Sequence, residues 1–278
     1  MNGTVSQLIT LASAANGVIS GRYNSESFYP THTDFKFCDS VIFVDIWKDR
    51  LEKIREDIRH NDPSHWLEHL VANGGTQVWL TYTAETEPAA PEHQLAAFVG
   101  GGGKWQLVVS MTDIIEFWVP RWQVIDQNAH DDRIWKVTYI RVNKSIGLIK
   151  VPQTDLDTAN SRLLNALNDI NEFAKKHSLT FWADLFMRAS NCLDESQPIT
   201  FPDHIDFVCL DSYPEISQRL FAAAYLGWVF GGMGSWNDQS FKPKTENDLY
   251  NTLTGNLYSE ITNAIQQATW SFNLSDAA

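Results

Sequence analysis

The chain has 278 residues, of which 44% are hydrophobic and 20% are charged, and it carries a formal net charge of −13 at pH 7. This size and hydrophobicity suffice for a substantial buried core, which argues against a disordered protein. The negative charge repels nucleic acid and anionic lipid, so we expect neither as a partner, whereas a basic protein would be attracted.

The cysteine content and the hydropathy pattern both indicate a cytoplasmic protein. Three cysteines, Cys38, Cys192 and Cys209, are too few and too scattered for a disulfide framework, which favours a reducing compartment. No Lys or Arg precedes Arg22 in the mildly apolar N-terminal stretch, which argues against a secretion signal. No apolar run approaches the length of about 18 residues that a membrane-spanning helix needs.

The first part of the chain is predicted to place short helices around one strong strand. Residues 4–15 are expected to form a helix, and 18–39 an irregular stretch with many Ser, Thr, Asp and aromatic residues. The apolar segment 41–47 predicts a buried strand. After it, three apolar residues at helical spacing predict an amphipathic helix over about 49–59. A second short helix is predicted from about 62 to 73.

The middle of the chain is predicted to form an antiparallel meander. Apolar and polar residues alternate over 77–83, 105–109 and 134–142, and apolar stretches lie between them at 95–99 and 114–119. A sheet face lined by tryptophans is either a core or a recognition surface, and we favour the core. The tryptophans concerned are Trp105, Trp118, Trp122 and Trp135.

The last part of the chain is predicted to be helical. Apolar residues follow one helix face over about 154–173, and a second helix is predicted over 181–193. A short strand over 205–210 is expected to lead into a central helix. The most regular pattern is that of the final helix, over about 249–272.

These predictions together give an α+β fold. A strand-rich, antiparallel N-terminal half at about 41–150 is expected to be covered by a helical C-terminal half at about 151–278. We expect one domain over 1–278, because the sheet face needs the helices to cover it. A subdivision into a strand-rich part (1–150) and a helical part (151–278) stays open.

The central helix and the loop after it are predicted to form the functional site. The run from Leu220 to Phe230 is apolar on all sides, so other elements must cover it, and the glycines that follow end the helix. The next residues then leave the core, and the glycines would let backbone amides approach a ligand there. The candidate ligand-binding residues of this loop are Ser235, Trp236, Asn237 and Asp238.

Three further polar residues complete this candidate site. Asp238 and His204 are the candidates for catalytic groups, although the sequence contains no complete catalytic motif around either. Arg121 lies between Pro120 and Trp122, where a guanidinium stacked on indoles would be well placed to bind a carboxylate. No cofactor is implied by any of these residues.

A metal site is the other candidate. His65, Glu68 and His69 form a literal His-x-x-Glu-His, the order that inverted zinc peptidases use. On a helix the two histidines share one face, and Glu68 lies beside it as a potential base. The predicted helix is short, however, and no third ligand follows in a helical context. A solvated polar face is therefore the default interpretation, with no metal expected.

Three functions are consistent with these observations. The first is a non-catalytic binding protein of the inhibitor or immunity type, whose acidic, aromatic-rich surface holds a basic protein or a small-molecule ligand. The second is a small-molecule enzyme with a polar pocket under the 231–238 loop. The third is a zinc hydrolase that uses His65 and His69. Because every catalytic motif is incomplete, we favour the binding protein.

Overall fold

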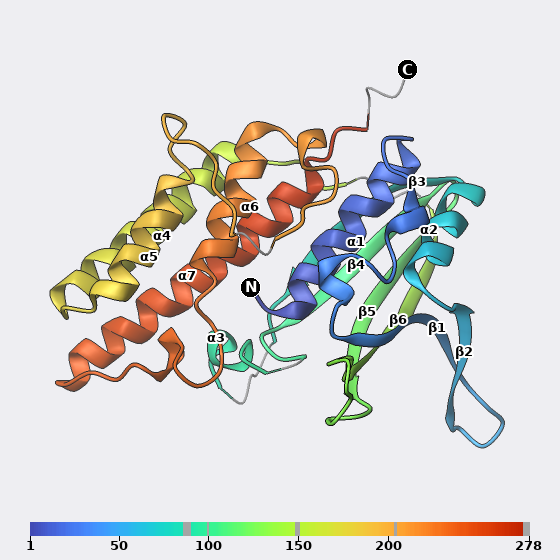
Figure 1. The fold of residues 1–278 in the computed structure, drawn as a ribbon, viewed down its shortest axis with the longest axis horizontal. Coiled ribbons are helices and arrows are strands. Elements are labelled where there is room, and N and C mark those ends of the chain that lie inside the picture. Colours follow the sequence, from blue (N-terminus) through green and yellow to red (C-terminus); the bar gives the residue numbers. More distant parts are fainter. Residues whose placement is uncertain (86–89, 99, 148–150, 203–204, 275–278) are drawn as a thin grey trace.

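The computed structural model describes residues 1–85, 90–98, 100–147, 151–202 and 205–274. They form a mixed α+β fold, in which a six-stranded sheet from the N-terminal half meets helices of the C-terminal half (Figure 1). The predicted fold class is thereby confirmed. Among the described residues, no helix combines the length and the apolar character that a membrane crossing requires.

The sheet has the strand order β2-β1-β6-β5-β4-β3. All neighbouring strands are antiparallel except β1 and β6, which are parallel. The meander from β3 to β6 thus places its last strand beside β1. The strands are β1 (Cys38–Lys48), β2 (Ile54–His60), β3 (Gly75–Thr83), β4 (Lys104–Met111), β5 (Ile114–Val124) and β6 (Trp135–Ile146).

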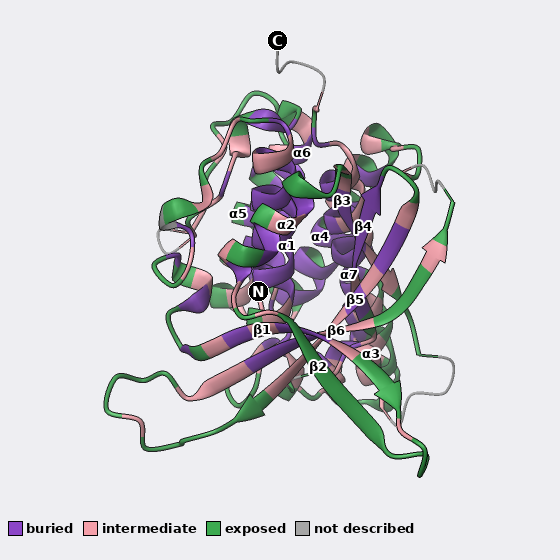
Figure 2. Cartoon of the chain, turned by 90° about the vertical axis from the view of Figure 1, so that its right-hand side faces the viewer, coloured by how far each residue is buried: buried purple, intermediate pink, exposed green. Residues whose placement is uncertain are grey.

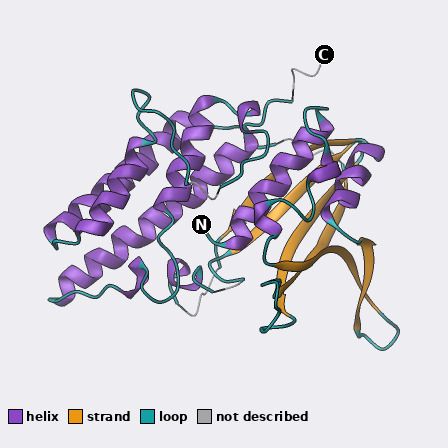
Figure 3. Cartoon of the chain, viewed as in Figure 1, coloured by secondary structure: helices purple, strands orange, loops and turns teal. Residues whose placement is uncertain are grey.

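The helices pack on one side of this sheet and on one another (Figure 3). Helices α1 and α2 lie against the strands, α7 contacts β3, and α4, α5 and α6 form a bundle with α7. The helices are α1 (Gly3–Ile19), α2 (Pro63–Ala72), α3 (Glu92–Leu95), α4 (Leu156–Lys176), α5 (Thr180–Asn191), α6 (Glu215–Gly227) and α7 (Lys244–Trp270).

The helix predicted over about 49–59 is wrong, because Ile54 begins strand β2. Apolar residues four apart, such as Ile54 and Ile58, fit a strand as well as a helix, and the turn before them decides between the two. In that turn, Asp49 Oδ1 accepts the backbone N–H groups of Leu51 and Lys53 at 2.8 and 3.0 Å. Such an Asx turn makes β1 and β2 a hairpin.

Two predicted strands are also absent, and the central helix is shorter than predicted. The described residues of 95–99 form the end of helix α3 and the turns after it. Residues 205–210 form no strand, and Cys209 in this segment adopts a left-handed φ of 52°. Helix α6 ends at Gly227 rather than at the later glycines. A Cβ at Gly227 would lie 3.3 Å from Ile261 and Leu167, so glycine allows close helix packing there.

Helix α1 is deeply buried, although its sequence predicts only a short helix. Every residue from Val5 to Gly17 is buried. Its polar side chains are tolerated because they have partners: Ser13 Oγ lies 2.7 Å from Tyr213 Oη, and Gln7 Oε1 accepts the Tyr139 hydroxyl at 2.8 Å. Helix α1 therefore joins the sheet to the helical bundle.

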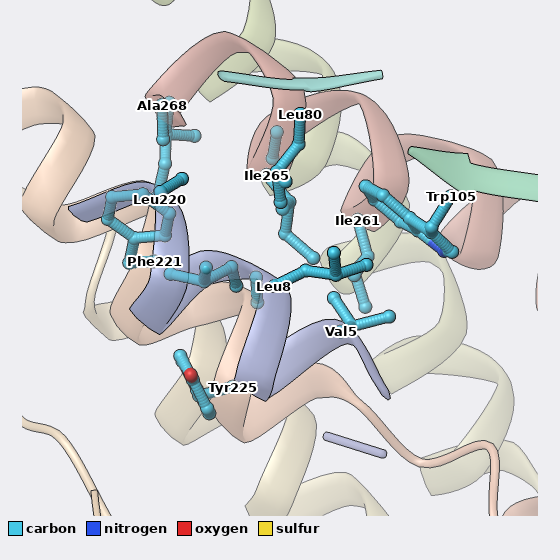
Figure 4. Close-up of a cluster of buried hydrophobic side chains, with 14 of the residues drawn as sticks. Val5, Leu8, Leu80, Trp105, Leu220, Phe221, Tyr225, Ile261, Ile265 and Ala268 are labelled. Atoms are coloured by element: carbon cyan, nitrogen blue, oxygen red, sulfur yellow. The ribbon is translucent and has the colours of Figure 1, made fainter. Parts of the chain in front are cut away.

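The apolar core surrounds α1 and continues through both halves of the chain. Figure 4 shows side chains from α1, α6, α7 and the sheet meeting in one cluster. Its labelled members are Val5, Leu8, Leu80, Trp105, Leu220, Phe221, Tyr225, Ile261, Ile265 and Ala268. The expectation that other elements cover α6 is met, since Leu220 and Phe221 are fully buried.

Candidate functional site

A cavity of about 400 Å³ opens at the N-terminal end of α1, between the sheet and α6. We call it the Asp34 pocket. Aromatic side chains contribute a large part of its apolar wall, and a carboxylate and hydroxyl groups supply its polar part. Its principal residues are Ser6, Asp34, Phe37, Phe98, Trp122, Trp135 and Tyr225.

Two tryptophans reach this pocket from neighbouring strands. Trp122 of β5 and Trp135 of β6 lie on the helical side of the sheet, where both pack against the main core. Their rings meet edge to face, with centroids 5.8 Å apart and an interplanar angle of 77°. The Trp135 backbone N–H also donates to the carbonyl of Phe37 at 3.1 Å. This bond ties the segment before β1 to the pocket wall.

Two phenylalanines lie at the pocket more openly. Phe37 is 52% exposed and Phe98 is 70% exposed, which is unusual for side chains of this size. Each lines the pocket with one part of its ring surface accessible to solvent. A ligand with its own apolar surface could cover both the half-buried tryptophans and the exposed phenylalanines.

Asp34 is held in place by two hydroxyl groups of α1. Its Oδ1 accepts from Ser6 Oγ at 2.6 Å, and its Oδ2 accepts from Thr10 Oγ1. Ser6 and Thr10 are four residues apart and therefore share one helix face. Ser6 Oγ also lies 3.1 Å from Tyr225 Oη. The carboxylate is thus oriented by neutral donors, with 17% of its side chain exposed.

Among the residues that the structure describes, no Lys or Arg side chain forms an ion pair with Asp34, and the nearest basic nitrogen of a side chain is His32 Nδ1, 3.6 Å from Asp34 Oδ2. His32 Nδ1 accepts the backbone N–H of Asp34 at 3.2 Å, and His32 Nε2 lies 2.9 Å from the Asp206 carbonyl. A neutral imidazole with its proton on Nε2 satisfies both contacts. In that tautomer His32 orients the Asp34 segment through both ring nitrogens.

Burial shifts the pKa of three other ionisable groups at the pocket toward the neutral form. Burial raises the pKa of the Cys38 thiol to about 11, and burial also raises the pKa of Tyr225. Burial lowers the pKa of the Met1 amino group to about 6, against a smaller opposing effect of Asp34. The ionisable groups that surround Asp34 in this pocket are thus shifted toward their neutral forms.

The loop predicted to bind a ligand uses its polar groups internally. Trp236 is fully buried, and its Nε1–H donates to Thr254 Oγ1 at 2.9 Å. Asn237 Nδ2 donates to the His93 carbonyl at 2.9 Å, which fixes the loop to α3. Asp238 accepts the Gly234 N–H, and the Ser235 hydroxyl likewise bonds within the loop. None of Ser235, Trp236, Asn237 and Asp238 lines the Asp34 pocket.

Of the two remaining members of that predicted site, the structure describes only Arg121, which lies elsewhere. Arg121 projects to the face of the sheet opposite Trp122, because neighbouring strand residues alternate. There it makes a bidentate ion pair with Glu56, at 2.6 and 3.0 Å. His204 lies outside the described residues. The structure thus does not bring Arg121 together with the 235–238 loop.

The histidines of the predicted metal site also point to separate partners. His65 Nδ1 bonds to Asp62 Oδ2 at 2.6 Å, whereas His69 Nδ1 lies 3.0 Å from Asn73 Nδ2 and its ring is 4.6 Å from that of His60. Glu68 is exposed. Within the described ranges, no group of three or more His, Cys, Asp or Glu side chains is placed to hold a metal ion.

Comparison with known proteins gave no match among family models, curated proteins or solved structures. Asp34, the main polar residue of the Asp34 pocket, was not predicted from the sequence. Ser6 and Thr10, four residues apart on one face of α1, were the available signal for a buried polar partner.

Proposed function

We propose that this protein is a non-catalytic binding protein whose ligand is a small organic cation held in the Asp34 pocket. One observation carries the proposal: an oriented carboxylate, with no Lys or Arg partner among the described residues, lines a cavity to which several aromatic rings also contribute. Aromatic faces attract cations through their quadrupoles, and a carboxylate supplies the countercharge.

The energetics favour a cation over an anion or a neutral molecule. Each ring that contacts an ammonium group contributes about 0.5 to 2 kcal/mol, with the larger values where water is excluded. Asp34 adds an ion pair in a partly desolvated site, and the net charge of −13 raises the local concentration of cations. An anion would be repelled both by the Asp34 carboxylate and by the net negative charge of the protein.

The size of the pocket supports a small molecule rather than a basic protein as the ligand. Its volume of about 400 Å³ falls in the range typical of small-molecule sites, which is about 300 to 1,000 Å³.

We further propose that the protein is located in the cytoplasm. Its cysteines, Cys38, Cys192 and Cys209, are all unpaired, which supports a reducing compartment.

Calorimetric titration with a matched pair of ligands tests this function. Choline and its neutral carbon isostere, 3,3-dimethylbutanol, differ mainly in charge. We expect choline to bind the wild-type protein at least about tenfold more tightly than the isostere, because only the cation gains from Asp34 and the rings. Asp34→Asn should remove most of that preference, whereas the exposed control Asp39→Asn should keep it.

Three outcomes would contradict the proposal. They are equal binding of the two ligands, unchanged choline binding by a folded Asp34→Asn variant, and no binding of choline or of smaller and larger alkylammonium ions. Because Asp34 also accepts two hydroxyl groups, Trp122→Leu is a second variant that tests the aromatic wall. It should weaken choline binding by about tenfold while leaving Asp34 in place.

A further inference from the structure

The two edge strands of the sheet, β3 and β2, differ in whether their outward-facing backbone groups have hydrogen-bond partners. At the β3 edge, side chains of α1 and α7 bond to the outward-facing backbone groups. Asn16 accepts the Val78 N–H at 2.8 Å and donates to the Val78 carbonyl at 2.7 Å. Gln266 accepts the Tyr82 N–H at 2.8 Å, and Trp270 donates to the Leu80 carbonyl at 2.8 Å. This edge is closed to further strands.

The β2 edge has no such cover. In the described part of the chain, no group bonds to the backbone of Ile54, Glu56 or Ile58 on the side away from β1. Figure 2 shows β2 exposed along most of its length, and Ile54 and Ile58 are 67% and 59% exposed. An open strand edge with apolar side chains pairs readily with another strand.

The hairpin geometry determines which residues face this edge. Asp49 N–H donates to the Lys53 carbonyl at 2.9 Å, so the 49–53 pair is a hydrogen-bonded one. Hydrogen-bonded and non-hydrogen-bonded pairs alternate along an antiparallel ladder. The pairs of β1 with Ile54, Glu56 and Ile58 are therefore of the second type. Their N–H and C=O groups point outward, toward a strand that could be added.

The sequence of β2 is complementary to itself in one antiparallel register. When Glu56 of one copy lies opposite Glu56 of a second copy, Ile54 faces Ile58 twice on one side of the sheet. On the other side, Arg55 faces Asp57 twice. Apolar pairs and opposite charges directly across a ladder each stabilise it by about 0.2 to 1 kcal/mol. The central Glu56 pair is compensated because each carboxylate already accepts two hydrogen bonds from Arg121.

The alternative registers are excluded by charge or by length. Centring on position 55 places two arginines together, and centring on 57 places two aspartates together. Centring on Ile54 sets Lys53 against Arg55. Centring on Ile58 shortens the paired segment, because β2 ends at His60. The charges of β2 thus oppose non-specific pairing and leave the Glu56 register.

From these contacts we propose that two copies of this chain associate through β2, around a twofold axis at Glu56, to form one continuous sheet of both copies. The backbone of β2 needs no rearrangement, because its outward-facing N–H and C=O groups are already extended and have no intramolecular partners among the described residues. The Arg55 side chain, which bonds to Asp49 of its own chain at 2.9 Å, would share its guanidinium with Asp57 of the second copy. Arg121 contributes by holding Glu56 neutralised at the axis. This association is independent of ligand binding in the Asp34 pocket.

Sedimentation analysis of charge variants, over a wide range of protein concentration, tests the association. Arg55→Asp and Asp57→Arg should each weaken dimer formation by about tenfold or more, because each sets like charges opposite one another twice. The double variant Arg55→Asp/Asp57→Arg should dimerise like the wild type. Asp169→Arg, on the exposed face of α4, is the control for the change in net charge that Asp57→Arg causes.

An equimolar mixture of the two single variants gives the sharpest result. A chain with Arg55→Asp then lies across the axis from a chain with Asp57→Arg, so opposite charges face each other twice. The mixture should therefore form heterodimers at protein concentrations at which each variant alone is mostly monomeric. Monomeric wild-type protein at the highest concentration would overturn the proposal. Dimers that tolerate both single variants, or that neither the mixture nor the double variant restores, would overturn it as well.

Discussion

Substitution of Asn16 by leucine gives a demanding test of how α1 is joined to the sheet. Asn16 is fully buried, and its side-chain amide satisfies both the N–H and the C=O of Val78, at 2.8 and 2.7 Å. Leucine has a similar size but offers neither a donor nor an acceptor. Asn16→Leu would therefore leave two backbone groups of β3 buried without a partner.

The expected cost follows from those two groups. Each buried backbone group that loses its partner costs about 1 to 3 kcal/mol, so the variant should be about 4 kcal/mol less stable than the wild type. Urea unfolding followed by circular dichroism measures this difference by linear extrapolation. The control Asn165→Leu, on the exposed face of α4, should change stability by less than about 0.5 kcal/mol.

A loss of less than about 1 kcal/mol in Asn16→Leu would refute this reasoning, since the Val78 groups would then have found other partners. A large loss in Asn165→Leu would show instead that leucine is poorly tolerated in these helices generally. Comparison of the two variants therefore separates the hydrogen bonds to Val78 from the effect of the amino-acid type.

Two further predictions concern charged groups. Arg219 of α6 is buried and donates to the carbonyls of Asp194 and Gln197 at 2.8 and 2.9 Å, so Arg219→Met should cost about 3 kcal/mol in the same urea experiment. Burial, followed by the charge of His69, lowers the pKa of His60 from 6.5 to about 4. The unfolded chain then binds more protons between these values, so stability falls as pH decreases from 6.5 to 4. His60→Gln should remove about 1 to 2 kcal/mol of that loss, whereas an unchanged pH profile would contradict it.

Local patterns predicted the long elements well. Helices α4 and α7 carry apolar residues every three or four positions, and the pattern alone places them. Where two periods fit equally well, as for Ile54 and Ile58, the pattern chose wrongly. The deciding feature was the turn at Asp49, a single side chain that bonds to its own backbone.

The candidate site was harder to predict because it is assembled from distant segments. Asp34 lies in a stretch without periodicity, and its partners Ser6 and Thr10 come from a helix whose burial on all sides is set by tertiary packing. The loop at 235–238 looked like a site because its residues are polar and follow glycines. In the structure those polar groups fasten the loop to α3 and α7.

The position of a bound cation is the most direct test of the Asp34 pocket. Indole N–H signals of ¹⁵N-labelled protein, assigned by substitution of single tryptophans, report contact during a titration with choline. We expect saturable shifts of the Trp122 and Trp135 signals, and little change at Trp236, which is buried in another part of the core. Shifts confined to Trp236, or shifts at Trp122 and Trp135 that persist unchanged in Asp34→Asn, would contradict cation binding by the Asp34 pocket.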